Sequence, residues 1–270
     1  MISQVEDFRA EAVELAALLE TLRGDGWART TQFKDWSVED VVLHLYASDA
    51  MAMASLDGEA AFARLRADML RARAGGASMI EESRRRFPDM RGTDLLRHWT
   101  DQVEALCSRL GERDPKERLP WSGPGMSLRM FATARQMETW AHGQEIYDSM
   151  GLARAPRDRL VNVATLGVRT FGWSFANRGL AAPPTAPVVR LDTPSGHPWV
   201  ANEDGDGEVS GTMVEFCQVV TQVRNVGDTS LRVRGEAAAA WMRIAQCFAG
   251  PPADPPPPGT RFARQAASTF

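Results

Sequence analysis

A glutamate and a histidine lie four residues apart in the stretch QMETWAHGQE, which covers residues 136 to 145. In a helix, Glu138 and His142 would project side by side from one face, because residues at i and i+4 are neighbours there. Such a pair is commonly a solvated ion pair that contributes about 0.3–0.5 kcal/mol. Carboxylates and imidazoles also bind divalent metals, so the pair could instead supply two ligands of a metal site.

A third candidate ligand, His44, lies in an earlier helical stretch at the margin of an apolar stripe that includes Val41, Val42 and Leu45. The inward margins of two helices can meet in a bundle, where two histidines and one carboxylate would form a three-ligand site with open positions. An ion held in this way keeps a net positive charge. It can therefore lower the pKa of a bound water or thiol and polarise a carbonyl. Zinc suits this ligand set, and nickel, iron or manganese accept the same ligand types.

Hydrophobic periodicity predicts the elements that would position these residues. Apolar residues recur at three- and four-residue steps in four long segments, which cover residues 5–23, 35–56, 92–111 and 127–150. The second segment opens with Ser37 and Asp40 in the spacing of a capping box. Shorter helical pieces lie between residues 59 and 90. Four amphipathic helices with one extended connection predict a four-helix bundle.

The residue pattern changes from helical to β-like after residue 180. Residues 156–180 predict one more helix, and four short β-like runs follow, separated by turn residues; the runs are VVRLD, HPWVA, GEVSG and LRVRG. Helical patterns at 212–224 and 236–248 flank the last run. The predicted fold class is therefore α+β, with a helical bundle in residues 1–152, a small α+β domain in 153–250 and a flexible, proline-rich tail in 251–270.

Composition excludes several classes of function. The 270 residues carry a net charge of -4, which gives no basic footprint for a nucleic-acid partner. No apolar run approaches the ~18 residues of a membrane span, and the acidic, amphipathic first segment does not resemble a signal peptide. The three cysteines are widely spaced without a CxxC motif, so disulfides are not expected and a cytoplasmic location is predicted.

Three segments carry a resemblance to known families. The segment DWSVEDVVLHL (residues 35–45) resembles the second helix of the DinB-like bundle superfamily. Residues 121–152 look like the metal-binding helix of the mycothiol-dependent maleylpyruvate isomerase-like proteins. Residues 220–252 look like the small C-terminal domain of those proteins, which is similar to sterol-carrier folds. By this likeness His44, Glu138 and His142 fall on the family's three metal-ligand positions.

The resemblance also implies an activity. A metal-bound low-molecular-weight thiol such as mycothiol would add to a conjugated double bond, rotation would follow, and the thiol would leave. The leading prediction is thus a metal-dependent isomerase or transferase that activates a small thiol toward an electrophilic small molecule. One alternative is a hydrolase or lyase of specialised metabolism that uses metal-bound water. Another is a non-catalytic carrier whose metal is structural, which a fourth protein ligand such as His98 would favour.

Other residues receive a prediction of their own. Arg135 lies one turn before Glu138 and is expected either to support Glu138 or to hold a substrate carboxylate. His98 is expected to be partly exposed, His197 to lie at a hairpin tip, and Cys107 to belong to the core. The loop at 121–127 is either a helix entrance capped by Ser127 or the lip of an anion pocket. The thiol-anchoring arginine is not placed among the candidates of 71–86, which are Arg71, Arg73, Arg84, Arg85 and Arg86.

Overall fold

The computed structural model describes residues 2–123 and 125–263. Within them the chain divides into two compact units, Met1–Ser149 and Met150–Phe270. The division falls at the end of the last helix of the bundle, close to the boundary expected at residue 152.

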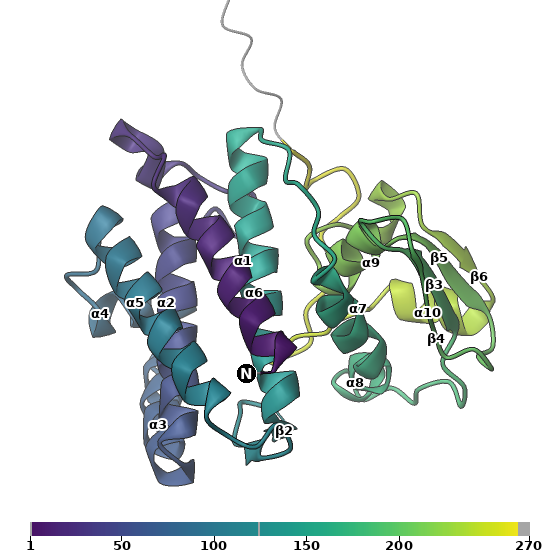
Figure 1. The fold of residues 1–270 in the computed structure, drawn as a ribbon, viewed down its shortest axis with the longest axis horizontal. Coiled ribbons are helices and arrows are strands. Elements are labelled where there is room, and N and C mark those ends of the chain that lie inside the picture. Colours follow the sequence, from purple (N-terminus) through teal and green to yellow (C-terminus); the bar gives the residue numbers. More distant parts are fainter. Residues whose placement is uncertain (1, 124, 264–270) are drawn as a thin grey trace, which may run out of the picture. The chain divides into compact units, whose positions relative to one another are not determined.

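The first unit is a bundle of four long helices, accompanied by shorter elements (Figure 1). The long helices are α1 (Ser3–Leu19), α2 (Val38–Leu56), α5 (Gly92–Gly111) and α6 (Leu128–Met150). The shorter elements are η1 (Gly24–Ala28), α3 (Glu59–Ala74), α4 (Met79–Arg86), and the strands β1 (Arg118–Leu119) and β2 (Met126–Ser127), which pair as a hairpin. All four predicted long helices are present.

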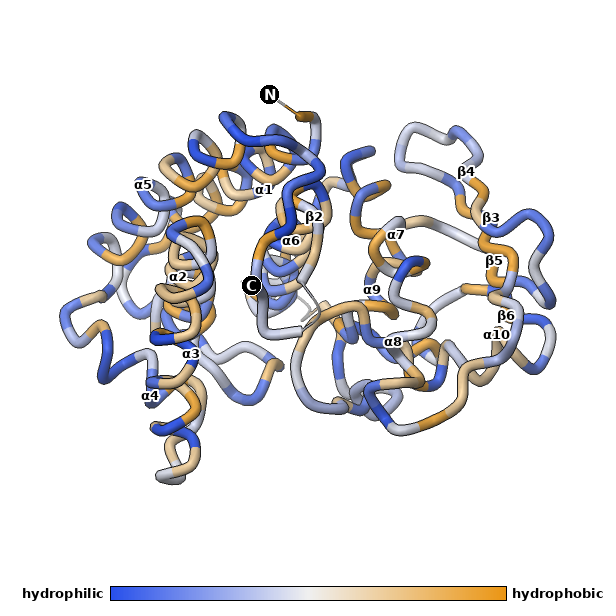
Figure 2. Tube along the Cα trace, turned by 90° about the horizontal axis from the view of Figure 1, so that it is seen from below, coloured by the Kyte–Doolittle hydropathy of each residue, from blue (hydrophilic) through white to orange (hydrophobic). Residues whose placement is uncertain are grey.

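Local sequence explains where α2 begins. The Ser37 hydroxyl accepts a hydrogen bond from the Asp40 backbone N–H (3.1 Å), and the Asp40 carboxylate accepts one from the Ser37 N–H (3.1 Å). This reciprocal capping box satisfies two backbone donors that a helix start would leave unpaired. Apolar stripes then hold α2 and α1 against α5, and Figure 2 shows apolar and hydrophilic residues alternating along these helices.

The second unit combines a four-stranded sheet with helices. Its helices are α7 (Leu160–Arg169), α8 (Phe171–Ala176), α9 (Met213–Val220) and α10 (Glu236–Met242), with a short helix η2 (Val226–Asp228). Its strands are β3 (Val188–Asp192), β4 (Pro198–Ala201), β5 (Glu208–Thr212) and β6 (Arg232–Arg234). The strand order is β4-β3-β5-β6, with β3 and β5 parallel and the other pairs antiparallel. The predicted α+β fold class is confirmed.

Two details of the second unit differ from the prediction. The helix expected over 156–180 is two helices, because the chain leaves helical geometry at Thr170, whose hydroxyl donates to the carbonyls of Leu166 and Gly167. Side-chain bonding of this kind competes with the backbone ladder. The helices expected over 212–224 and 236–248 end early, at Val220 and Met242.

Residues 251–261 of the predicted flexible tail form hydrogen bonds with other parts of the second unit. Gln222 donates its side-chain amide to the Ala253 carbonyl (2.7 Å), and the Gln246 side-chain oxygen accepts from the Ala253 N–H (3.0 Å). Asn225 donates to the carbonyl of Pro256, which is buried. Side-chain amides thus replace the missing secondary structure as partners of this backbone. The remainder of the predicted tail, 264–270, lies outside the described residues.

Candidate metal centre

Two helices of the first unit bring the three predicted ligands together. His44 lies on α2, about one turn beyond Asp40 of the capping box, and Glu138 and His142 lie on one face of α6. Glu138 Oε2 is 3.6 Å from His44 Nε2 and 3.4 Å from His142 Nε2. One ligand atom from each of the three residues lies within 4.8 Å of the other two. The side chains are 11–22% exposed, so the cluster is largely buried and keeps limited exposure to solvent.

These separations fit a shared ion better than direct hydrogen bonds. Hydrogen bonds between nitrogen and oxygen span about 2.7–3.2 Å, shorter than either contact of Glu138. Two ligands on a tetrahedral ion with bonds of about 2.1 Å lie about 3.4 Å apart. The donor set of two imidazoles and one carboxylate is also one that catalytic zinc sites use, with a remaining position open to water or substrate. The residues present therefore fit a divalent metal.

The electrostatics of the cluster favour metal-binding protonation states. Burial lowers the pKa of His44 to about 4, and the nearby His142 acts in the same direction against the opposing effect of Glu138. Burial would raise the pKa of Glu138, but the two histidines and the Arg135 charge hold it well below its usual value. Near neutral pH, His44 is thus a neutral imidazole with a free lone pair, and Glu138 is an anion beside it.

An aromatic collar, formed by Phe33 and Trp36 ahead of α2, packs against the two histidines of the cluster and was not predicted. The Phe33 ring lies 4.9 Å from the His142 ring, and the Trp36 ring lies 5.4 Å from the His44 ring. Ligand histidines usually donate their second nitrogen to an acceptor, but His142 Nδ1 is buried and has no hydrogen-bond partner in the described part of the chain. Packing against the collar orients this ring instead.

Arg135 forms a buried ion pair one turn before Glu138. Its Nε donates to Asp49 Oδ1 at 2.8 Å, and both side chains are at most 1% exposed. The other Asp49 oxygen accepts from Trp99 Nε1 at 3.0 Å. Arg135 therefore supports Glu138 through its charge, while its hydrogen bond goes to α2. Burial raises the pKa of Asp49 despite these two donors. Asp49 was missed, although a lone carboxylate inside the apolar stripe of α2 was a visible signal.

The remaining candidates supply no ligand atom to the cluster. His98 is not among the converging ligand atoms, and its Nε2 lies 3.3 Å from Arg97 Nη2 at the surface. The His197 N–H donates to the Thr193 hydroxyl in the β3–β4 hairpin. Cys107 is fully buried, and burial raises its thiol pKa to about 12, so it remains protonated and unreactive.

Three of the five candidate arginines in 71–86 form ion pairs with nearby acids. Arg84 pairs with Glu39 and Asp40 at the start of α2, and Arg86 pairs with Glu82. Arg71 pairs with Asp68. These contacts therefore do not identify which arginine would bind the thiol.

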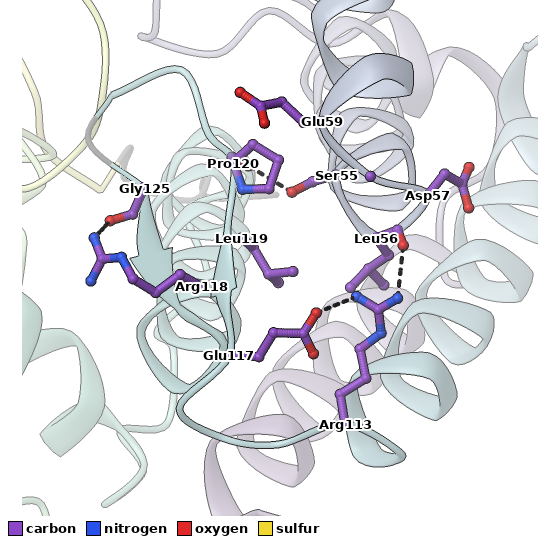
Figure 3. A pocket seen from close by; sticks show the side chains of 11 residues that line it. Ser55, Leu56, Asp57, Glu59, Arg113, Glu117, Arg118, Leu119, Pro120 and Gly125 are labelled. Carbon is purple, nitrogen blue, oxygen red and sulfur yellow. Dashed lines mark hydrogen bonds and ion pairs between the residues drawn. The ribbon is translucent and has the colours of Figure 1, made fainter.

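The end of the loop at 121–127 forms the entrance to α6. The Ser127 hydroxyl accepts from the Met130 N–H at 3.4 Å, as expected of a cap. Leu128, at the start of α6, lies ten positions before Glu138, which corresponds to about 15 Å along the axis. A cavity of about 500 Å³ opens here, at the β1–β2 hairpin and the α2–α3 junction (Figure 3). Arg113 bridges its floor by donating to Glu117 and to the Leu56 carbonyl. None of the three candidate ligands lines it.

No helix in the described part of the chain is long and apolar enough to cross a membrane.

Comparisons with known proteins connect this geometry to a family. The sequence model of the mycothiol maleylpyruvate isomerase N-terminal domain matches residues 8–147, a range that contains all three candidate ligands. Two relatives, described as uncharacterized proteins of Mycobacterium tuberculosis strains CDC 1551 and H37Rv, are each 36% identical over 249 residues, covering 92% of this chain and 96% of theirs. Two crystal structures of the mycothiol-dependent maleylpyruvate isomerase, one of a mutant, match with TM-scores of 0.52 and 0.50 at 15% and 17% identity. Each match covers 80% of this chain and 87% of the other. At this identity the structural likeness establishes the fold alone.

Proposed function

The chain belongs to the mycothiol maleylpyruvate isomerase N-terminal domain family, and from this premise we propose that it is a metal-dependent isomerase or transferase. In this proposal a low-molecular-weight thiol, mycothiol or a similar compound, is the co-substrate. The substrate is an electrophilic small molecule. The observation that carries the proposal is the convergence of His44, Glu138 and His142 with separations suited to one divalent ion.

The residues of the cluster would hold the ion and leave it reactive. His44 and His142 would each bind through Nε2, and Glu138 through Oε2. A divalent ion such as zinc, bound there, lowers the pKa of a coordinated thiol or water and polarises a carbonyl. Structural zinc sites normally close with four protein ligands. Three ligands with His98 elsewhere therefore support a catalytic site over the structural metal of a carrier protein.

The chemistry proposed is reversible addition to a conjugated double bond. The thiol sulfur forms a bond to one alkene carbon, rotation occurs about the resulting single bond, and the sulfur leaves as the double bond re-forms. The thiol is unchanged overall. In the transferase variant the sulfur displaces a leaving group and stays attached. The collar would exclude water from one side of the substrate, because Phe33 and Trp36 cover the two histidines.

Metal content gives the first test. Purified protein should hold about one divalent ion per chain, because three converging ligands bind far more tightly than one or two. His142→Ala should lose the ion and keep the helical circular dichroism of the parent, since the apolar stripes rather than the metal stabilise the bundle. His98→Ala is the matched control and should keep the ion. A parent protein with no first-row metal and no zinc uptake on titration would contradict the proposal.

A cobalt-substituted sample then separates thiol chemistry from water chemistry. Added mycothiol, or a simpler cysteinyl thiol, should produce a sulfur-to-metal charge-transfer band near neutral pH. The free thiol pKa is about 8.5, so the band requires the metal to favour the thiolate. Metal-loaded protein that shows neither the band nor thiol binding by calorimetry would leave a metal-bound-water hydrolase or lyase as the better explanation.

A further inference from the structure

Thr139 lies on α6 between the two ligands that this helix contributes to the candidate metal centre. Its side chain is fully buried, and its hydroxyl has no hydrogen-bond partner in the part of the chain that the structure describes. Burial of a hydroxyl without a partner is unfavourable, because the group gives up its hydrogen bonds to water. Such groups are few in native proteins, and an ordered water or ion is a common explanation for them.

Other threonines of the bundle satisfy their hydroxyl groups on their own helix. Thr100 donates to the Arg97 carbonyl at 2.8 Å, and Thr133 donates to the Arg129 carbonyl at 3.1 Å. Bonding to a carbonyl three or four residues earlier is the usual solution for a threonine within a helix. The hydroxyl of Thr139 makes no such bond to any described residue, so its oxygen is turned away from the carbonyl of the preceding turn.

The second nitrogen of His142 is in the same situation. Nδ1 is buried and lacks a hydrogen-bond partner within residues 2–123 and 125–263. Nε2 lies 3.4 Å from Glu138 Oε2 and is the nitrogen that would bind the metal, so Nδ1 is left to carry the proton. Because Nδ1 is attached to the ring carbon that joins the side chain, it lies nearer to the backbone of α6 than Nε2 does.

Helix geometry brings the Thr139 hydroxyl and His142 Nδ1 onto neighbouring turns. The two residues are three positions apart, so their Cβ atoms are separated by about 5–6 Å. Side chains in a helix lean toward its N-terminus, which places the His142 ring over the turn that contains Thr139. The two polar atoms do not bond directly. A buried water needs at least two polar partners, and one water oxygen can accept from Nδ1–H and donate to the Thr139 oxygen.

We propose that a buried water molecule links His142 Nδ1 to the Thr139 hydroxyl, and that Thr139 is thereby a positioning residue of the metal centre. The inference rests on the proposed function, because it concerns how one ligand of the proposed metal is held. Donation from Nδ1–H fixes the tautomer in which Nε2 carries the lone pair, and it makes Nε2 a stronger ligand. The collar restrains the same ring by packing at 4.9 Å from Phe33, so the two contacts are complementary.

Thr139→Val tests the inference, because valine has nearly the shape of threonine and lacks the hydroxyl. Zinc affinity, measured in competition with a chromophoric chelator, should fall about 10- to 100-fold, the usual effect of removing the partner of a metal-binding histidine. The NMR signal of the His142 Nδ1 proton in the zinc-loaded protein should move upfield and exchange faster with solvent. A purely structural role of Thr139 would leave that signal unchanged. Thr139→Ser keeps the hydroxyl and should stay close to the parent in both measurements.

Thr133→Val is the matched control, because Thr133 is also buried on α6 and its hydroxyl bonds to the Arg129 carbonyl. It should keep the zinc affinity and the His142 signal of the parent. Thr139→Ala removes the same hydroxyl and serves if Thr139→Val does not fold.

Unchanged zinc affinity in Thr139→Val overturns the inference, as does an equal loss in Thr133→Val. A Thr139→Val protein that only gains resistance to urea would also overturn it, since the hydroxyl would then be unsatisfied rather than bonded to water. A parent that binds no zinc contradicts the proposed function itself, whereas zinc binding that is independent of Thr139 contradicts this inference alone.

Discussion

Helices α5 and α6 belong to the same bundle, but they bury different kinds of residue. α5 buries a single apolar stripe, which includes Leu95, Trp99, Val103 and Leu106. α6 buries most of its residues, and many of them are polar or charged, including Arg135, Gln136, Thr139, His142 and Gln144. Burial of a polar group destabilises a fold unless a partner is supplied. The difference indicates that α5 stabilises the bundle through packing, whereas α6 gives up part of that stability to carry the candidate site.

Breaking the buried ion pair of α6 should have the largest effect. Arg135→Met leaves the Asp49 carboxylate buried without its countercharge, which should lower the free energy of unfolding by about 3–5 kcal/mol. Urea titration followed by circular dichroism measures this. Adding Asp49→Asn to the same chain should recover most of the loss, because no buried charge remains and the amide oxygen can still accept from Trp99. An Arg135→Met protein as stable as the parent would show that the ion pair with Asp49 does not stabilise the fold.

A cavity in the apolar stripe of α5 should lower the free energy of unfolding by a similar or smaller amount, through lost packing rather than an unpaired charge. Leu106 is fully buried, so Leu106→Ala should lower the free energy of unfolding by about 2–5 kcal/mol through lost packing. Its metal content should match that of the parent, in contrast with His142→Ala. Loss of the metal from folded Leu106→Ala would show that packing and ligand geometry are not separable in this bundle.

The smallest expected effect lies at the start of α2 and depends on pH. Burial alone would raise the pKa of Asp40, but hydrogen bonds from Ser37 and the Arg84 ion pair outweigh it and hold that pKa below its usual value. A carboxylate with a depressed pKa in the folded state stabilises the fold above its unfolded pKa of about 3.9, and the contribution is lost as the pH falls through the folded value.

Asp40→Asn should therefore cost about 1 kcal/mol near pH 7, the usual worth of a helix cap, and progressively less toward pH 3. Denaturation midpoints of both proteins across this range measure the difference. A constant difference over the whole range would assign the effect to hydrogen-bond geometry rather than to the charge of Asp40.

The bundle could be predicted from the sequence because its signals are local and periodic. The apolar stripes of α1, α2 and α5 repeat at helical spacing. The Ser37–Asp40 cap is recognised from two residues three positions apart. Glu138 and His142 were predicted from their i, i+4 spacing, and the choice of His44 depended on the resemblance as well. The structure brings the three together, while metal binding itself stays a prediction.

The missed features depend on contacts that spacing does not encode. Asp49 reads as an interruption of an apolar stripe until Arg135 and Trp99 are seen to surround it. The turn at Lys34 and Asp35 contains no glycine, so its left-handed backbone leaves no mark in the sequence. The break at Thr170 interrupts a continuous helical pattern through a side-chain hydrogen bond.

The hydrogen bonds of the proline-rich stretch 251–261 determine where the chain can be truncated without damage. Its carbonyls and amides are the partners of Gln222, Asn225 and Gln246, which belong to the body of the second unit. Removing it would leave those carboxamides facing positions that water must fill or that stay unpaired. Tolerance of truncation follows such hydrogen bonding rather than composition. A protease that favours unstructured substrate should therefore spare these residues, and a truncation placed at Gly250 would damage the domain instead of trimming it.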